Sequence, residues 1–348
     1  MFDRNLKYYR LKRNMSKKEL AAACGLTPMA ISNYESGKRM PDMVIIKRLA
    51  GTLGIHVVDF LESRNAALTF RHNEFRKNSR LTKNQQEYVK ESVEEYFSRF
   101  FSAVDFAGGR PLPVPLAVHS VSFSGDFRTD ALSLRKTLDF SAEGPIDGLI
   151  GALENKGILV MELDISSHDF SGMNGTVNEY PYIVINRQMT PERKRTTIAH
   201  ELAHLFGNWD RIPEQEREAY ATKIAGAFLI PTPDLIRELG IHRSAITSDM
   251  VLVCQEYGIS MYLLITRASQ EKIISDSLAT RSYIYFNKAG WRQHEPQRVR
   301  TVEQPSLFRQ LVYRAVNEEG LSIQKGAELL KEPVAELEEY CGRMEAND

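Results

Sequence analysis

The stretch TTIAHELAHLFG, residues 196–207, places two histidines four positions apart, with a glutamate directly after the first. Residues at that spacing lie on one face of a helix, so His200 and His204 can offer two imidazoles to a single metal ion. Alanine and leucine fill several of the other positions, which favours a helix that Thr196 can cap and Gly207 can end. The stretch therefore predicts a helix with a metal-binding face and an apolar face.

Glu201 adds a carboxylate beside the first imidazole. Neutral imidazoles suit zinc, and a zinc ion with three protein ligands keeps a fourth position for water, whose pKa it lowers to about 7. A neighbouring carboxylate can take the proton of that water. A catalytic site needs a third ligand, and an acidic, then apolar segment, PEQEREAYATKIAGAFLIP at 213–231, follows the histidines. The alternative left open is that the pattern arose by chance on an ordinary helix.

The composition is that of an ordinary globular chain of 348 residues, which is long enough for two or three domains. The formal net charge is zero, but residues 1–64 hold 12 Lys and Arg against 6 Asp and Glu. This basic excess points to a polyanionic partner for that segment alone. Residues 332–348 hold 6 acidic residues and a single arginine, which predicts a solvated tail or a partner surface.

Three widely spaced cysteines offer neither a disulfide framework nor a CxxC metal site, which fits a reducing cytosol. The start, MFDRNLKYYRLKRN, has no apolar signal region, and no apolar run is as long as a membrane span. We therefore expect a soluble, cytoplasmic protein that is not exported and has no membrane partner.

Five short helices are predicted in residues 1–64 from their end signals. The capping and breaking residues are Ser16, Glu19, Gly25, Thr27, Pro28, Gly37, Pro41, Asp42 and Gly54. The second and third helices are joined by a tight turn that contains glycine. That arrangement is typical of a helix-turn-helix, whose second helix enters the major groove of DNA. The segment therefore predicts a DNA-binding domain.

Residues 16–41, SKKELAAACGLTPMAISNYESGKRMP, resemble the Xre/Cro family of repressors, whose domain is a five-helix, lambda-repressor-like fold. The resemblance implies contacts to base edges and phosphates from the turn and the third helix. The implied DNA-contacting residues are Thr27, Met29, Ser32 and Asn33, with Lys17, Lys18, Lys38 and Arg39 on the DNA backbone. Lys17 stands where the family commonly has glutamine. Xre-type proteins usually dimerise on two-fold sites, so the resemblance also implies a homodimer and double-stranded DNA as partner.

The region after the N-terminal domain begins with a connector. Apolar residues recur at helical spacing and predict a long helix over 82–103. The stretch GGRPLPVP at 108–115 cannot continue a helix and predicts a loop. We interpret the aromatic residues of the long helix as core rather than as a cofactor site.

An α+β pattern follows the connector. The predicted helices are TDALSLRKTLDF (129–140) and GPIDGLIGALENKG (144–157), and the predicted strands are ILVMELDI (158–165) and YPYIVINRQ (180–188). Residues 166–179 between the strands are rich in Gly, Asn and Ser, so we expect a loop there. A sheet beside the metal-binding helix could present an edge to an extended peptide.

Three motifs of this region resemble the ImmA/IrrE family of zinc metallopeptidases, which often follow an Xre-type domain in one chain. The motifs are GPIDGLIGALENKGILV, PYIVINRQMTPERKRTTIAHELAHLFG and EAYATKIAGAFLIP, and the resemblance extends over residues 70–291. It implies a zincin-like fold with Zn²⁺ as cofactor, His200 and His204 as ligands, and Glu201 as general base. Members of the family cleave repressor or antitoxin proteins, so a DNA-binding regulator is the implied substrate.

The resemblance also implies where the third ligand lies. In this family it is a glutamate on the helix after the histidines, and Glu218 fits best when counted back from AGAFLIP. Some relatives have Glu or Gln where this chain has Tyr220, which leaves the register open. Glu214 and Glu216 are therefore kept as alternatives.

The remaining third of the chain is predicted to be mainly helical. Two helices are expected in residues 244–270, a short strand and a loop in 282–296, and three helices in 305–344. The domain boundaries predicted from these patterns are 1–64 for DNA binding, 65–110 for the connector, 111–275 for the metallopeptidase and 276–348 for a C-terminal helical region. We expect that last region to serve self-association or sensing.

Three functions remain open at this point. The first is a DNA-binding regulator that is also a zinc endopeptidase in a phage, toxin–antitoxin or stress circuit. The second is a transcriptional regulator or antitoxin that uses the peptidase fold as a zinc or ligand sensor without proteolysis. The third is a peptidase whose N-terminal module binds protein rather than DNA.

Overall fold

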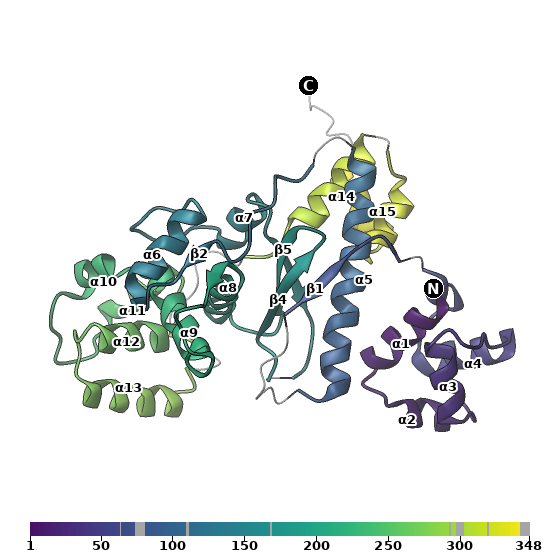
Figure 1. Ribbon diagram of the computed structural model, residues 1–348, viewed down its shortest axis with the longest axis horizontal. Helices are drawn as coiled ribbons and strands as arrows, with labels where there is room; N and C mark the ends of the chain where they lie inside the picture. The colour runs from purple at the N-terminus through teal and green to yellow at the C-terminus, as the bar shows by residue number, and fades with distance from the viewer. Residues whose placement is uncertain are drawn as a thin grey trace. The chain divides into compact units, whose positions relative to one another are not determined.

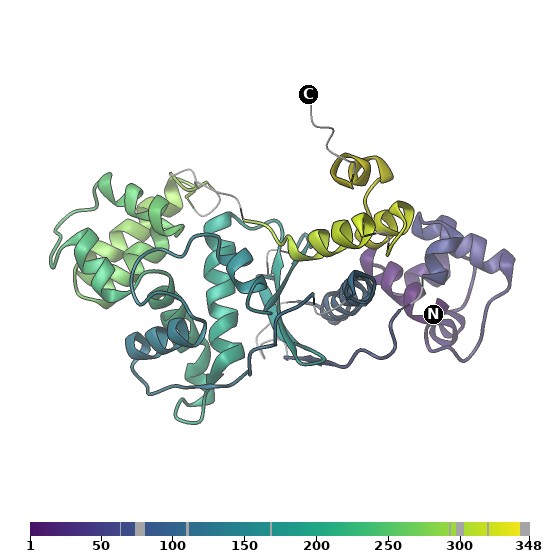
Figure 2. The same ribbon diagram turned by 90° about the horizontal axis from the view of Figure 1, so that it is seen from above.

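A computed structural model describes residues 1–62, 64–73, 81–108, 111–167, 169–291, 294–296, 303–318 and 320–341 of the chain. The chain divides into two compact units, one formed by Met1–Pro111 with Phe308–Asp348 and the other by Leu112–Leu307. Figures 1 and 2 show the elements of each unit in two views. Gly109 and Arg110 of the predicted loop, and residues 342–348 of the acidic end, lie outside the described residues.

The first unit opens with a domain of short helices. They are α1 (Phe2–Lys12), α2 (Lys17–Ala23), α3 (Pro28–Glu35), α4 (Met43–Leu53) and the 3-10 helix η1 (Val57–Leu61). The predicted end signals are confirmed: Ser16 and Glu19 form a capping box, and Thr27 accepts a hydrogen bond from Ala30 N. Gly54 ends α4 in the left-handed region, at φ 65°. The fifth predicted helix is a single 3-10 segment rather than an α-helix.

A buried ion pair ties α3 to α1. Arg10 donates from Nη2 to Glu35 Oε2 at 3.0 Å and from Nε to the other carboxylate oxygen. Its Nη1 donates to the carbonyl oxygen of Met15 at 2.7 Å, in the turn before α2. The two charged side chains are only 2% and 3% exposed. Because a two-point arginine–carboxylate contact permits one relative orientation, this pair fixes how α3 is presented.

The rest of the first unit is built around one long helix. Its elements are β1 (Phe70–His72), α5 (Lys83–Ala107), α14 (Leu307–Asn317), α15 (Ile323–Leu330) and α16 (Val334–Cys341). The predicted long helix is confirmed and extends beyond residue 103. The rings of Tyr96 and Phe100 on α5 lie 5.2 and 5.5 Å from that of Phe308 on α14. The three C-terminal helices were also predicted.

The second unit combines a small sheet with helices. Its elements are β2 (Val121–Ser122), α6 (Phe127–Thr137), α7 (Leu149–Glu154), β3 (Leu159–Leu163), β4 (Gly172–Val177), β5 (Tyr180–Asn186), α8 (Pro191–Phe206), β6 (Gly207–Asn208), η2 (Glu214–Glu216), α9 (Arg217–Leu229), α10 (Thr232–Leu239), α11 (Asp249–Tyr257), α12 (Met261–Gln270) and α13 (Asp276–Lys288). The predicted C-terminal region 276–348 is divided between the two units, with α13 in the second.

Strand β5 lies between two partners. It pairs in parallel with β3, Leu159 opposite Tyr182, and antiparallel with β4, Asn174 opposite Ile183. Helix α8 packs against β4 and β5. The core between them includes Ile183 and Ile185 of the sheet, and Ile198, Leu202 and Phe206 of the helix. The apolar face predicted for the histidine helix is therefore buried, which leaves the histidine face for other contacts.

Three predictions about this unit are wrong. Part of the expected loop at 166–179 is strand β4, which antiparallel pairing with β5 stabilises. The expected strand within 282–296 is helix α13, capped by Ser275. Helix α8 begins at Pro191, capped by Thr190, rather than near Thr196. Proline at the first helical position is favourable, and the Thr196 hydroxyl donates to the Glu192 carbonyl inside the helix instead.

The chain is thus multidomain and mainly helical, with α+β structure in the second unit, and the predicted fold class is confirmed. Among the described residues, no helix combines the length and the apolar composition that crossing a bilayer requires.

Glu35→Ala should strongly destabilise the N-terminal domain. It leaves the buried Arg10 guanidinium without its carboxylate, and breaking such a pair costs about 3–5 kcal/mol. Glu328→Ala is the control, because the pair of Lys325 and Glu328 is exposed (40% and 53%) and exposed pairs contribute about 1 kcal/mol or less. Thermal unfolding of the full chain can be monitored by circular dichroism. The midpoint temperature of the first transition should fall for Glu35→Ala only. Equal midpoints for both variants would contradict the role assigned to the pair.

Candidate metal centre

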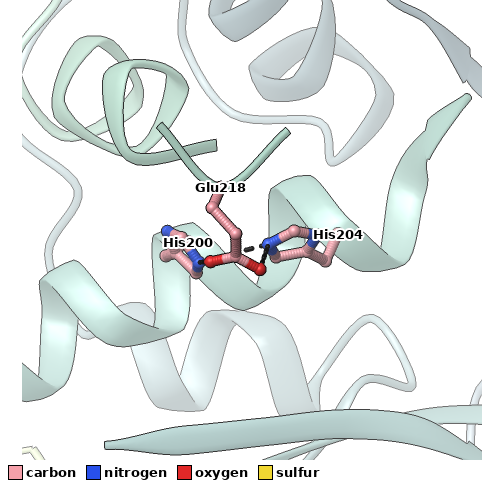
Figure 3. Close-up of side chains that lie close together, drawn as sticks. All are labelled: His200, His204 and Glu218. Carbon is pink, nitrogen blue, oxygen red and sulfur yellow. Dashed lines mark hydrogen bonds and ion pairs between the residues drawn. The ribbon is translucent and has the colours of Figure 1, made fainter. Parts of the chain in front are cut away.

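Two helices of the second unit bring three side chains to one point (Figure 3). His200 and His204 project from one face of α8, and Glu218 reaches them from the first turn of α9. His200 Nε2 lies 3.1 Å from His204 Nε2. The two carboxylate oxygens of Glu218 lie 3.5 Å from the first of these nitrogens and 3.4 Å from the second. One donor atom from each residue lies within 4.8 Å of the others.

The two imidazole nitrogens are spaced as neighbouring ligands of a tetrahedral zinc ion would be. With metal–ligand bonds of about 2.0–2.1 Å, neighbouring donor atoms of a tetrahedron are about 3.3 Å apart. Here the two imidazole nitrogens are 3.1 Å apart, and each has a different oxygen of Glu218 at 3.4–3.5 Å. Two imidazoles and a carboxylate are also a donor set of open zinc sites, which keep one position for water. The residues present therefore fit the metal that the sequence pattern suggests.

The structure distinguishes among the three glutamates considered for the third ligand. Glu218 belongs to the cluster with His200 and His204. Glu214 and Glu216 form the exposed 3-10 helix η2 before α9 and are not part of that cluster. The register counted back from AGAFLIP is thus the one whose side chain meets the two imidazoles.

The hydroxyl of Thr222 lies within hydrogen-bonding distance of the His200 ring. That hydroxyl donates to the carbonyl oxygen of Glu218, one turn earlier on α9, at 2.9 Å. With that proton engaged, the hydroxyl oxygen can accept a hydrogen bond from His200 Nδ1, 3.3 Å away, in the tautomer that carries a proton there. A proton on Nδ1 leaves the lone pair on Nε2, the nitrogen that faces His204 and Glu218. Hydrogen bonds of this kind orient metal-binding imidazoles and fix their tautomer.

Glu201 lies beside the cluster but is not part of it. The residue is 7% exposed, and its Oε2 accepts a hydrogen bond from Asn174 Nδ2 on β4 at 2.6 Å. A general base must lie within reach of a water or substrate proton in a fixed orientation. The buried amide of Asn174 fixes the orientation of the carboxylate that follows the first imidazole in the sequence.

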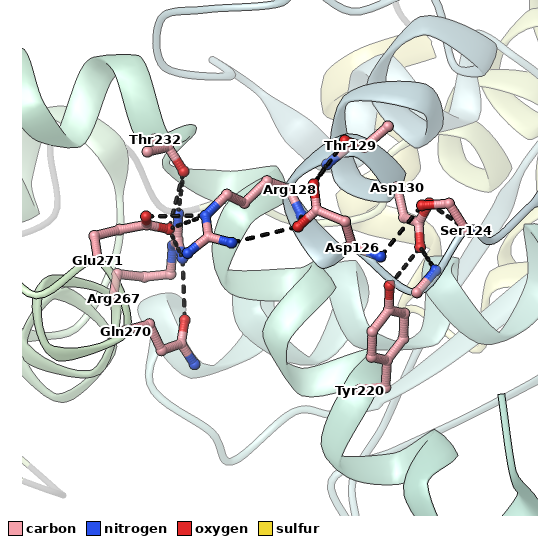
Figure 4. Close-up of polar contacts among 11 residues, drawn as sticks. Ser124, Asp126, Arg128, Thr129, Asp130, Tyr220, Thr232, Arg267, Gln270 and Glu271 are labelled. Atoms are coloured by element: carbon pink, nitrogen blue, oxygen red, sulfur yellow. Dashed lines mark hydrogen bonds and ion pairs between the residues drawn. The ribbon is translucent and has the colours of Figure 1, made fainter.

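Aromatic residues flank the cluster. The Trp209 ring centroid is 5.2 Å from that of His204 and 6.4 Å from that of Tyr220. The Tyr220 hydroxyl donates to the buried Asp130 of α6, which also accepts from Ser124 (Figure 4). Burial, with the hydrogen bond to Asp130 and its charge, raises the pKa of Tyr220 well above its ordinary value. Tyr220 therefore stays protonated as a donor to Asp130.

Sequence reasoning missed both Thr222 and Asn174. Thr222 had a usable signal, because it lies four residues after Glu218 and so shares its face of α9. Asn174 had none, because it falls in the segment 166–179 that the composition assigned to a loop. Its place beside Glu201 depends on the pairing of β4 with β5.

The residues implied as DNA contacts lie in the helix-turn-helix segment of the first unit. Lys17, Lys18, Thr27, Met29, Lys38 and Arg39 are exposed, and Ser32 and Asn33 are half-buried. Met29 is 69% exposed, which is high for a large apolar side chain. Lys17 Nζ lies 3.3 Å from Ser32 Oγ and 3.7 Å from Glu35 Oε2, so this lysine also makes contacts inside the domain.

Thr222→Val should weaken Zn²⁺ binding by about tenfold, the lower end of the range for residues that orient metal ligands. The valine keeps the size of the side chain but removes the acceptor for His200 Nδ1. Thr196→Val is the matched control, because its hydroxyl also donates to the carbonyl four residues earlier but bonds no imidazole. Competition with a chromophoric chelator measures both affinities. Equal Zn²⁺ affinity in the two variants would contradict the orienting role.

Comparison with protein-family models identifies two parts of the chain. Residues 6–60 match the model described as Helix-turn-helix, and residues 153–269 match a peptidase model described as IrrE N-terminal-like domain. No curated protein and no solved structure matched the chain. The second range contains His200, His204 and Glu218. The resemblance to both families is thereby confirmed, and the chain joins a DNA-binding helix-turn-helix domain to a metallopeptidase-like IrrE N-terminal-like domain.

Proposed function

We propose that this chain is a DNA-binding transcriptional regulator whose second unit is a zinc-dependent endopeptidase. The observation that carries the proposal is the cluster of His200, His204 and Glu218, whose donor atoms lie within 4.8 Å of one another, with Glu201 next to His200 in the sequence. The family match over residues 153–269 supports a metallopeptidase-like domain independently of that geometry. The proposed zinc ligands are the three clustered residues, and the proposed general base is Glu201.

The proposed chemistry divides between the ion and the chain. When bound, zinc would supply a Lewis acid that polarises a carbonyl and lowers the pKa of a water molecule toward neutrality. Glu201 takes a proton from the attacking water on one of its carboxylate oxygens and later gives it to the leaving amine. His200 and His204 would hold the ion through Nε2, and Thr222 would accept the Nδ1 proton of His200 on the other side of the ring.

A protein is the proposed substrate. The ImmA/IrrE resemblance implies a repressor or an antitoxin, and a DNA-binding domain in the same chain would bring the peptidase to a promoter where such a protein acts. This arrangement suits a phage, toxin–antitoxin or stress circuit. A homodimer on a two-fold DNA site is proposed from the Xre resemblance.

The proposed DNA surface combines side chains that touch bases with side chains that touch phosphates. Thr27, Met29, Ser32 and Asn33 are the proposed base or phosphate contacts, and Lys17, Lys18, Lys38 and Arg39 hold the backbone. Exposure of the last two, at the end of the helix-turn-helix, supports their role. Phosphate contacts of this kind position a protein without reading sequence.

Glu201→Gln should abolish cleavage of a co-expressed regulator encoded beside the protein, while zinc content stays at that of the wild type. The amide cannot accept the proton, and Glu201 is not among the proposed ligands. Glu216→Gln, in exposed η2, is the control and should cleave normally. Gel analysis gives the cleavage and atomic absorption gives the metal. Undiminished cleavage by Glu201→Gln would refute the mechanism, and zinc binding without cleavage by the wild type would favour the sensor function.

Lys38→Ala and Arg39→Ala should each weaken binding to the chain's own promoter fragment about equally for specific and unrelated DNA. Each should also reduce the slope of log affinity against log salt by about 1, because one phosphate contact is lost. Lys325→Ala on α15, whose charge is paired with Glu328, is the control. Fluorescence anisotropy at several salt concentrations measures the slopes. An unchanged slope in both variants would argue against these contacts.

A further inference from the structure

Strand β4 presents two unusual residues toward helix α8. Gly172 and Asn174 are separated by two positions, so they lie on the same face of the strand. Each comes close to the same side chain, the Glu201 carboxylate. The two contacts are of different kinds, one a hydrogen bond and one a steric fit.

Asn174 supplies the hydrogen bond. Its Nδ2 donates to Glu201 Oε2 at 2.6 Å, and the two residues are 4% and 7% exposed. The backbone of Asn174 is fixed by the antiparallel ladder, opposite Ile183 of β5. A donor on a paired strand is rigid, because strand and rotamer are both held by their surroundings. The amide therefore holds one oxygen of Glu201 in a set place.

Gly172 leaves space for the side chains of Thr197 and Glu201. A Cβ atom at this position would lie 2.6 Å from Thr197 Cγ2, 3.1 Å from the Val184 carbonyl oxygen and 3.3 Å from Glu201 Oε1. The first distance is shorter than real Cβ contacts allow, so a side chain at residue 172 would force Thr197 or its surroundings to move. The absent methyl group thus leaves room for the second oxygen of Glu201.

We propose that Gly172 and Asn174 form a seat on β4 that positions the Glu201 carboxylate for its work beside the metal ligands. This inference rests on the proposed peptidase function, in which Glu201 is the general base. Asn174 is a positioning residue that acts through Glu201. The rate of proton transfer depends on placing the general base within a few tenths of an ångström. A buried amide that fixes the Glu201 carboxylate would therefore contribute to catalysis.

The competing explanation is that Asn174 and Glu201 are a buried pair that only stabilises the fold. The two explanations predict different affinities of the Asn174 variant for a small zinc-binding ligand. Acetohydroxamate chelates zinc through two oxygens and donates a hydrogen bond to a carboxylate beside the metal. Its binding can be measured without identifying the protein substrate. If Asn174 positions Glu201, removing its amide should weaken acetohydroxamate binding. If the pair only stabilises the fold, acetohydroxamate affinity should stay the same.

The experiment uses the full chain loaded with Zn²⁺ and measures acetohydroxamate affinity by calorimetry. Asn174→Leu, similar in size but without the donor, should weaken binding about tenfold while leaving zinc content unchanged. Glu201→Gln should weaken it at least as much. The double variant should bind no worse than Glu201→Gln alone, because Asn174 acts through Glu201. Met173→Leu, on the opposite face of β4, is the matched control and should bind as the wild type does.

A second readout uses the metal-free protein. The side-chain ¹⁵N–¹H resonances of Asn174 should shift in Glu201→Gln, because the bond to a carboxylate is replaced by one to a neutral amide. Three outcomes would each contradict the proposed positioning role. They are wild-type affinity in Asn174→Leu, additive losses of affinity in the double variant, and unshifted Asn174 resonances in Glu201→Gln. A zinc-loaded wild type that does not bind acetohydroxamate would refute the peptidase function instead, and the seat with it.

Discussion

The packing of α8 against α9 is the constraint on which the candidate centre depends. The spacing of the two histidines fixes their separation along α8, but the third donor comes from a different helix. The buried faces of both helices carry alanines, among them Ala199 and Ala203 on α8 and Ala221 and Ala225 on α9. Small side chains allow helix axes to approach closely. Glu218 can therefore reach both imidazoles from the first turn of its own helix.

Sequence reasoning succeeded where function and local structure use the same residues. The capping box, the prolines and the glycines of the N-terminal domain mark helix ends by mechanisms that need no tertiary information. The placement of the two histidines could also be predicted, because residues four positions apart lie on the same face of a helix. Glu218 was predicted by counting from a family motif, and the structure brings it to the imidazoles.

The failures have a common physical origin. The segment GMNGTV has two glycines and an asparagine, which are poor strand residues, and only pairing with the buried β5 makes it a strand. SYIYFNK is rich in residues that favour strands, yet it is helical in α13, where Phe286 packs into the core. In both cases tertiary contacts overrule local preference. Asn174 could not be singled out because its importance depends entirely on that pairing.

The first unit contains residues from both ends of the described chain, and this has a consequence for its synthesis. Tyr96 and Phe100 of α5 leave the ribosome some two hundred residues before Phe308, their ring partner on α14. While the segment between them is being made, the aromatic face of α5 lacks that partner. A chain that stops early, or is cut after the metallopeptidase-like domain, would expose this face to chaperones and degradative proteases. The ring of Phe308 on α14 would cover that face once it is made.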